Sequence, residues 1–383
     1  MRVDLEKLGL RLRTYREQLQ ETLSEVSDAT GIPGERLAAL ESGSIRPSGD
    51  EILILADHWA CDVEALLAAD GGQPINETEI LYRRHGRDFS KEDRRVVQEF
   101  LFLCEMEASL IRELGRNIRT FSHKPTGSHY KAQGERGALA LRRFFEYESG
   151  APRVAMDIYR DFRSIGAHIF RRHLLNSNIS GLFISHPTAG ACLLVNYDED
   201  VYRQRFSVAH EMAHAIFDQS ERAVVSFTSS QQGNFKEYRA NRFASCYLIP
   251  PSIVKNLPDP ARWSETDARH WANRFKVSCT ALGIALREAR VVSPSVSKRI
   301  QGFRVPAEAK VDPELSSDLS VRAAARKREL LARGLSDFYA NVCFEAHERG
   351  LISIGRLAEA LLSDIGDLAD IAKLYRRSLR YGD

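Results

Sequence analysis

The sequence of 383 residues contains few cysteines and no long hydrophobic run. Its six cysteines are scattered along the chain, without a close pair or the spacing of metal ligands. This pattern is typical of reduced thiols and argues against a secreted protein held together by disulfides. No apolar stretch approaches the roughly 20 residues of a membrane span, and the N-terminus lacks the apolar core of a signal peptide. We therefore expect a cytoplasmic protein that does not enter a membrane.

The apolar content of 43% and the charged content of 28% are those of a soluble globular protein. Because domains usually contain about 100 to 200 residues, the chain has room for two or three of them. Helical patterns dominate, and β-rich runs are confined to one stretch. The sequence thus predicts an α+β fold that is mostly helical.

The most informative stretch is residues 205–217, which read Arg-Phe-Ser-Val-Ala-His-Glu-Met-Ala-His-Ala-Ile-Phe. His210 and His214 are four residues apart, so a helix would place both imidazoles on one face, where they can reach the same ion. Glu211 follows the first histidine and suits a base that takes the proton of a water on the metal. The spacing predicts a zinc site of the His-Glu-x-x-His type. Two histidines paired with surface carboxylates are the plainer alternative.

A third protein ligand is expected from another segment, because catalytic zinc sites usually have three. Residues 236–250 have the pattern of a helix that ends at a proline. Glu237 lies in its first turn, and the small residues Ala240 and Ala244 would let this helix pack closely against the histidine helix. We therefore expect Glu237 to be the third ligand and Asn241 to orient a ligand.

Two alternatives remain at this position. A glutamate in the first turn of a helix is also favoured by the helix dipole, without any metal. His270 is the second choice of third ligand, although its neighbours have the pattern of an amphipathic surface helix.

Three segments of the chain resemble the ImmA/IrrE zinc peptidases, which pair a minimal metallopeptidase domain with the regulation of repressor proteins. They are residues 205–217, 237–244 and 248–250. The resemblance implies that His210, His214 and Glu237 hold Zn²⁺ and that Glu211 acts as the general base. It also implies that the substrate is a cognate repressor protein.

Residues 1–70 are expected to form five short helices. Thr22-Leu-Ser-Glu25 is a capping-box pattern that opens the second helix, and Gly31-Ile-Pro33 makes the turn to the third. With the sequence Leu-Glu-Ser-Gly-Ser-Ile-Arg-Pro at residues 40–47, this order resembles the helix-turn-helix domain of the Xre/Cro repressors.

In such a domain the third helix enters the major groove of DNA. By position, Arg36 would face bases, and Ser44 and Arg46 would face phosphates. The charge argues against this role, because residues 1–70 hold seven basic and fourteen acidic residues, a net charge of −7. Phosphate contacts supply most of the non-specific affinity for DNA. Because of the fold resemblance, operator DNA remains one expected partner of this domain. Docking on a protein or dimerisation is the alternative, which the charge favours.

Residues 71–136 are expected to form a linker that contains one long helix. The sequence Gly-Gly-Gln-Pro at residues 71–74 indicates a turn region. Residues 90–115 carry the apolar stripe of a long amphipathic helix. Such a stripe usually belongs to a core, and a homodimer contact is the alternative.

The peptidase domain is expected at residues 137–295, with a small antiparallel sheet against the histidine helix. Three β-rich runs, at residues 167–172, 179–185 and 191–196, are separated by turn residues. An edge of such a sheet can hold an extended substrate by strand addition, although the sequence does not say which edge. Residues 296–383 are expected to form a helical C-terminal region that serves for packing, and a sensor or oligomerisation region is the alternative.

The motifs and the resemblance together predict a zinc-dependent endopeptidase. It would cleave a cognate helix-turn-helix repressor and so switch on a stress, mobile-element or induction response. One alternative is a DNA-binding transcriptional regulator whose peptidase-like domain acts as a sensor. Another is a component of a toxin-antitoxin or defence pair.

Overall fold

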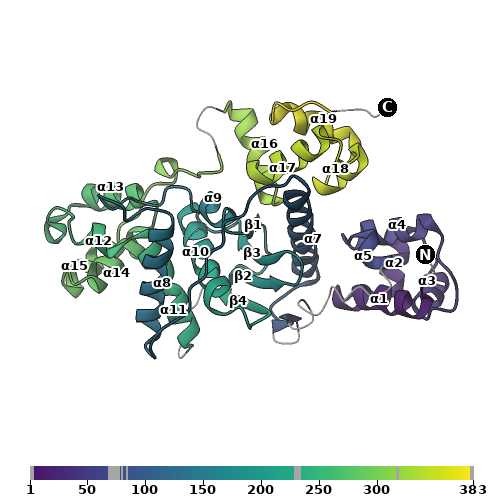
Figure 1. Cartoon of the computed structure of the whole chain (residues 1–383), viewed down its shortest axis with the longest axis horizontal. Coiled ribbons are helices and arrows are strands. Elements are labelled where there is room, and N and C mark those ends of the chain that lie inside the picture. The colour runs from purple at the N-terminus through teal and green to yellow at the C-terminus, as the bar shows by residue number, and fades with distance from the viewer. Residues whose placement is uncertain are drawn as a thin grey trace.

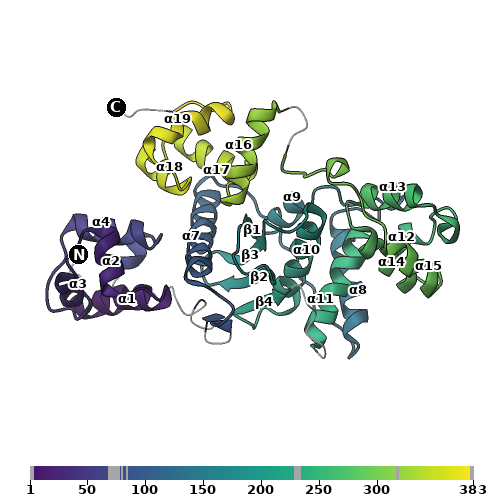
Figure 2. The ribbon, with the colours of Figure 1, turned by 180° about the vertical axis from the view of Figure 1, so that it is seen from behind.

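The computed structural model describes residues 4–67, 78, 81–82, 85–227, 234–315 and 319–379. The turn region expected at residues 71–74 lies outside these ranges. The N-terminal helices lie at one end of the molecule, a sheet with its covering helices lies at the centre, and residues 251–301 form the other end (Figure 1 and, from behind, Figure 2). Among the described helices, none has both the length and the apolar character needed to cross a bilayer.

The N-terminal bundle has the five helices expected from the sequence. They are α1 (Leu5–Gln18), α2 (Leu23–Thr30), α3 (Gly34–Glu41), α4 (Gly49–His58) and α5 (Val63–Leu67). Thr22 and Glu25 form the predicted capping box, which satisfies two backbone N–H groups at the start of α2. Gly31 follows with a φ of 73°, a left-handed conformation that suits glycine, and turns the chain into α3.

Helix α7 (Lys91–Glu113) joins this bundle to the rest of the molecule. Its first turns meet the bundle through ion pairs. Nζ of Lys91 lies 2.7 Å from Oε1 of Glu25, and Nη2 of Arg95 lies 3.0 Å from Oε1 of Glu21. The bundle is thus held to α7 by charges of opposite sign.

The central sheet has four strands in the described part of the chain, in the order β1-β3-β2-β4. They are β1 (Ala167–Arg172), β2 (Ile179–His186), β3 (Gly190–Asn196) and β4 (Ala223–Phe227). The prediction of an antiparallel sheet was wrong in one respect, because β1 pairs with β3 in parallel. The hairpin of β2 and β3 turns back so that β3 lies between β1 and β2 and runs in the direction of β1. The fourth strand, β4, was not predicted.

Side chains alternate between the two faces of the sheet, and each face belongs to a different core. Ile169, Phe183 and Leu193 point into the core that contains α10 (Val201–Phe217). Their neighbours Phe170 and Leu194 point into the core that contains α7 and α17 (Asp337–Glu348). The apolar stripe of α7 therefore belongs to a core and is not an exposed surface for dimerisation.

Helices on both sides of α10 complete the central and far parts of the molecule. They are α8 (Tyr130–Phe144), α9 (Ile158–Arg163), α11 (Phe235–Leu248), α12 (Pro251–Val254), α13 (Glu265–Phe275), α14 (Cys279–Glu288) and α15 (Pro294–Gln301). Helix α8 packs along α11 at Gly134, where an added Cβ would lie 2.4 Å from the carbonyl oxygen of Arg239. Only glycine allows this approach of the two backbones.

The C-terminal region is helical, as expected. Besides α17 it contains α16 (Val321–Ala332), α18 (Ile354–Ala360) and α19 (Ile365–Leu374). Because α7, the sheet and α17 share one core, this region is not an independent appendage. The domain boundaries at residues 70, 136 and 295 remain predictions.

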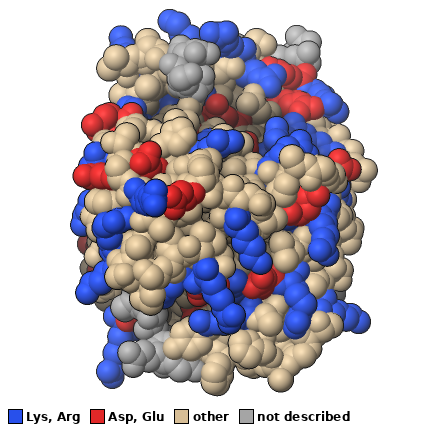
Figure 3. All heavy atoms as spheres, turned by 90° about the vertical axis from the view of Figure 1, so that its left-hand side faces the viewer, with Lys and Arg blue, Asp and Glu red and all other residues tan. Residues whose placement is uncertain are grey.

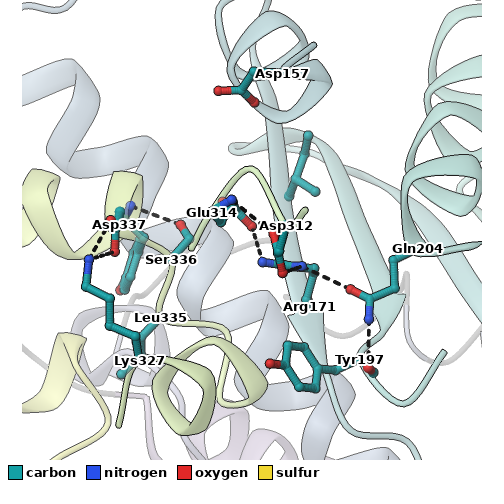
Figure 4. Close-up of polar contacts among 12 residues, drawn as sticks. Asp157, Arg171, Tyr197, Gln204, Asp312, Glu314, Lys327, Leu335, Ser336 and Asp337 are labelled. Carbon is teal, nitrogen blue, oxygen red and sulfur yellow. Dashed lines mark hydrogen bonds and ion pairs between the residues drawn. The ribbon is translucent and has the colours of Figure 1, made fainter. Parts of the chain in front are cut away.

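A buried ion network fastens the segment before α16 to β1 and α10 (Figure 4). Arg171 of β1 lies 2.8 Å from Asp312 and 2.8 Å from Oε2 of Glu314. The other carboxylate oxygen of Glu314 lies 2.8 Å from Arg163 at the end of α9. Arg171 also donates to Oε1 of Gln204 on α10 at 3.1 Å. Burial alone would raise the pKa of Glu314, but the two guanidinium groups hold it below its usual range.

We predict that Glu314→Gln lowers the free energy of unfolding by about 3 kcal/mol, because it leaves two buried guanidinium groups without their shared carboxylate. Urea denaturation followed by circular dichroism measures the change. The matched control is Glu329→Gln, whose side chain is 63% exposed and whose loss should cost less than about 0.5 kcal/mol. Equal midpoints for the two variants would contradict the prediction.

Candidate metal centre

Helix α10 directs two histidines toward one point. It lies buried along most of its length in the core between the sheet and α11. Nε2 of His210 and Nε2 of His214 lie 3.2 Å apart, as their spacing on one helix face predicted. Both side chains are buried. This burial disfavours the alternative of two histidines paired with surface carboxylates.

Glu237 reaches the same point from the first turn of α11. Its two carboxylate oxygens lie 3.1 Å from Nε2 of His210 and 3.3 Å from Nε2 of His214. The buried Ala240 and Ala244 on α11 leave room for the two helices to pack closely. One ligand atom from each of the three residues lies within 4.8 Å of the other two. Two imidazole nitrogens and a carboxylate oxygen are a donor set that zinc accepts, with a fourth position for water or substrate.

Each histidine is oriented through its other ring nitrogen. Oδ1 of Asn241 lies 3.1 Å from Nδ1 of His210, in the place proposed for it from the sequence. Oδ2 of Asp218 lies 2.9 Å from Nδ1 of His214, and Arg239 donates to the other oxygen of Asp218 at 2.6 Å. Partners of this kind fix the ring orientation, so that each Nε2 points toward the centre.

Asp218 was not predicted, although the sequence carries a signal for it. It follows His214 by four residues, which extends the four-residue spacing that relates the two histidines. Asp218 lies just past the end of α10 and accepts a hydrogen bond from Nδ1 of His214. Nε2 of the same ring faces Glu237. The missed signal was thus a carboxylate at the spacing of a histidine partner.

The charges of the cluster stabilise one another. Burial lowers the pKa of His214, but hydrogen bonds to Asp218 and Glu237 outweigh it and raise this pKa to about 9. Partial burial would raise the pKa of Glu237, but the two histidines hold it well below its usual range. The carboxylate of Glu237 is therefore ionised, which is the form that binds a metal, whereas His214 would release a proton on binding one.

Glu211 is fully buried, and the hydroxyl of Ser226 on β4 is a polar neighbour of its carboxylate. Neither carboxylate oxygen has a hydrogen bond of regular geometry among the described residues. Its side chain packs on Gly181 of β2, where an added Cβ would lie 3.1 Å from Oε1. Burial raises the pKa of Glu211, although the charges of His210 and His214 oppose the rise. A carboxylate of raised pKa beside a metal centre is suited to take and return a proton.

The structure does not bring the other candidate ligand to the centre. His270 lies exposed on α13, with its ring against Trp271. It is not among the residues that form the cluster. Two residues were considered as the third ligand, Glu237 and His270. Only Glu237 lies within reach of the two histidines.

The residues predicted to contact DNA lie apart from the metal centre, on the N-terminal bundle. Arg36 of α3 pairs with Glu51 of α4, and Nη2 donates to Oε2 at 2.8 Å. Ser44 and Arg46 are exposed in the loop after α3. The side chain proposed to read bases is thus already engaged within the bundle.

Two family models match the chain. Residues 162–287 match a model of the M78 peptidases, described as an IrrE N-terminal-like domain. Residues 7–69 match a helix-turn-helix domain. The first match contains the whole described sheet, α10, α11 and every residue of the cluster. No curated protein matches the chain. Both matches agree with the resemblance drawn from the sequence.

We predict that Asp218→Asn weakens zinc binding about 10- to 100-fold, because His214 loses the carboxylate that orients it. Competition titration of the purified protein with a zinc chelator measures the affinity. The control Asp259→Asn removes an exposed carboxylate far from the cluster in sequence and should bind zinc as the wild type does. Unchanged affinity in Asp218→Asn would contradict the role given to this residue.

Proposed function

Since residues 162–287 form an IrrE N-terminal-like domain and residues 7–69 a helix-turn-helix domain, we propose that the protein is a zinc-dependent endopeptidase. Its substrate is a cognate helix-turn-helix repressor, and cleavage switches on a stress, mobile-element or induction response. The single observation that carries the proposal is the arrangement of Glu211. Its carboxylate is buried, without a hydrogen bond of regular geometry among the described residues, beside three residues whose donor atoms converge.

The mechanism assigns one task to each side chain. His210, His214 and Glu237 would hold the zinc, which lowers the pKa of a water toward neutrality and polarises the scissile carbonyl. Glu211 takes one proton from the attacking water, whose oxygen forms a bond to the carbonyl carbon. As the carbon–nitrogen bond breaks, Glu211 passes that proton to the leaving nitrogen. Asn241 keeps His210 in position throughout.

The sheet supports the choice of one edge for the substrate. Its edge strands are β1 and β4. Strand β1 adjoins the C-terminal region, through a bridge between Arg172 and Arg333. Strand β4 pairs with β2, whose Gly181 packs on Glu211. In the proposed arrangement, an extended segment of the repressor pairs with β4 and runs past the centre.

The N-terminal bundle would then dock on the repressor. Residues 1–70 carry a net charge of −7, and Arg36 is engaged by Glu51. The basic residues lie elsewhere. Residues 255–304, at the opposite end of the molecule, contain ten lysines and arginines and four acidic residues, and basic side chains are frequent on the surface there (Figure 3). An acidic helix-turn-helix domain is poorly suited to DNA phosphates. It is better suited to a basic DNA-binding protein.

A second candidate function is that of a DNA-binding regulator, which the helix-turn-helix match favours. In that case the peptidase-like domain is a sensor, and the N-terminal bundle binds operator DNA through α3, Ser44 and Arg46. The two functions differ in one simple respect. The peptidase consumes its partner, whereas the regulator leaves all proteins intact.

We predict that Glu211→Gln retains zinc and lowers the rate of repressor cleavage about 1,000-fold, because glutamine cannot take a proton. The substrate to use is the small helix-turn-helix repressor encoded nearest to this protein. Zinc-loaded wild type and variant are incubated with it, and fragments are identified by gel electrophoresis and mass spectrometry.

The control is Glu265→Gln, which changes an exposed glutamate on α13 and should cleave at the wild-type rate. Equal cleavage by Glu211→Gln would remove the assigned role of this residue. No cleavage by zinc-loaded wild type, together with tight binding to promoter DNA, would favour the regulator instead.

A further inference from the structure

A cavity of about 320 Å³ opens between α10, α11 and α14. Two of the residues that line it adjoin the metal centre. Asn241 contacts Nδ1 of His210, and the ring centroid of Phe206 lies 6.5 Å from that of His210. The cavity therefore adjoins His210 on the side of its Nδ1, one imidazole ring away from the point where the donor atoms converge.

Much of the wall of the cavity is apolar. Phe206 stands one helical turn before His210 on α10, and Val277 precedes α14. Ala281 and Ile284 lie three residues apart on α14, and both face the cavity. An apolar side chain that enters here leaves water for apolar contacts, which is favourable.

The charged side chains of the lining are already paired. The pairs are Arg242 with Glu135 at 2.6 Å and with Glu288, Lys131 with Glu288 at 3.8 Å, and Arg203 with Glu199 at 3.5 Å. A charged side chain that entered the cavity would have to compete with these pairs for its partner. The electrostatics thus favour an uncharged occupant.

The size of the cavity limits the occupant further. Sites for whole small-molecule ligands have volumes of about 300 to 1,000 Å³. A cavity of about 320 Å³ is at the lower end of this range, which gives room for one large side chain.

We propose that this cavity receives a large apolar side chain of the substrate, such as leucine or phenylalanine, next to the scissile bond. Ala281 and Ile284 set the size that it accepts. The proposal rests on the proposed peptidase function and names the kind of sequence that the enzyme would cut.

The test uses the zinc-loaded full-length protein and a library of random peptides, with cleavage sites identified by mass spectrometry. Wild type should cut next to Leu, Ile, Met and Phe. Ala281→Trp, which fills the cavity, should lower kcat/KM for these sites at least 10-fold and shift cleavage toward small residues. Ile284→Ala, which enlarges it, should shift cleavage toward Phe and Trp.

The matched control is Arg287→Trp, which places the same bulky group on the exposed side of α14, outside the cavity. It should cleave as the wild type does, and thermal melting and zinc content should be unchanged in all variants. Cleavage without preference, or with a preference that neither Ala281→Trp nor Ile284→Ala alters, would overturn the proposal.

Failure of the peptidase function gives a different result. If no peptide is cut, binding of N-acetyl-phenylalaninamide, followed by NMR, tests the cavity alone. Binding to wild type and Arg287→Trp but not to Ala281→Trp would support the cavity without the peptidase. Equal binding to all three, or to none, would overturn the proposal.

Discussion

The arrangement of the candidate metal centre depends on the burial of ionisable side chains between α10 and α11. A buried polar group without a partner costs free energy, so each such group needs a compensating contact. His210 has Asn241, His214 has Asp218, and Asp218 has Arg239. These contacts hold the imidazoles with Nε2 toward Glu237. Glu211 is the exception, because its two oxygens have no hydrogen bond of regular geometry among the described residues. A group that the protein leaves unsatisfied in such a place is available for a reaction.

The N-terminal half of α10 is held by an ion network that includes residues before α16. Gln204, six residues before His210, accepts from Arg171, which is paired in turn with Asp312 and Glu314. The C-terminal helices share their core with α7 and the sheet. The C-terminal region therefore supports the strand and the helix on which the centre is built. A packing role explains its contacts without any further activity.

Sequence reasoning could bring His210, His214 and Glu237 together because the signals for them are local. His210, Glu211 and His214 form one motif, and Glu237 and Asn241 form another on the next helix. Long-range contacts were harder to predict. The parallel pairing of β1 with β3 depends on which strands lie side by side. The sequence of one strand does not indicate which other strand it pairs with. Strand β4 is only five residues long, which makes its sequence signal weak. Asp218 is a different case, because its spacing of four residues from His214 is a local signal that was missed.

The central claim is that two histidines and one glutamate from two helices hold a single zinc ion. X-ray absorption spectroscopy of the zinc-loaded protein, with wild type beside Glu237→Gln, tests it most directly. We predict one zinc per chain, with two imidazoles at about 2.0 to 2.1 Å and a carboxylate oxygen at about 2.0 to 2.2 Å, and altered coordination in the variant. Scattering from sulfur at about 2.3 Å, or identical spectra for wild type and variant, would contradict the account.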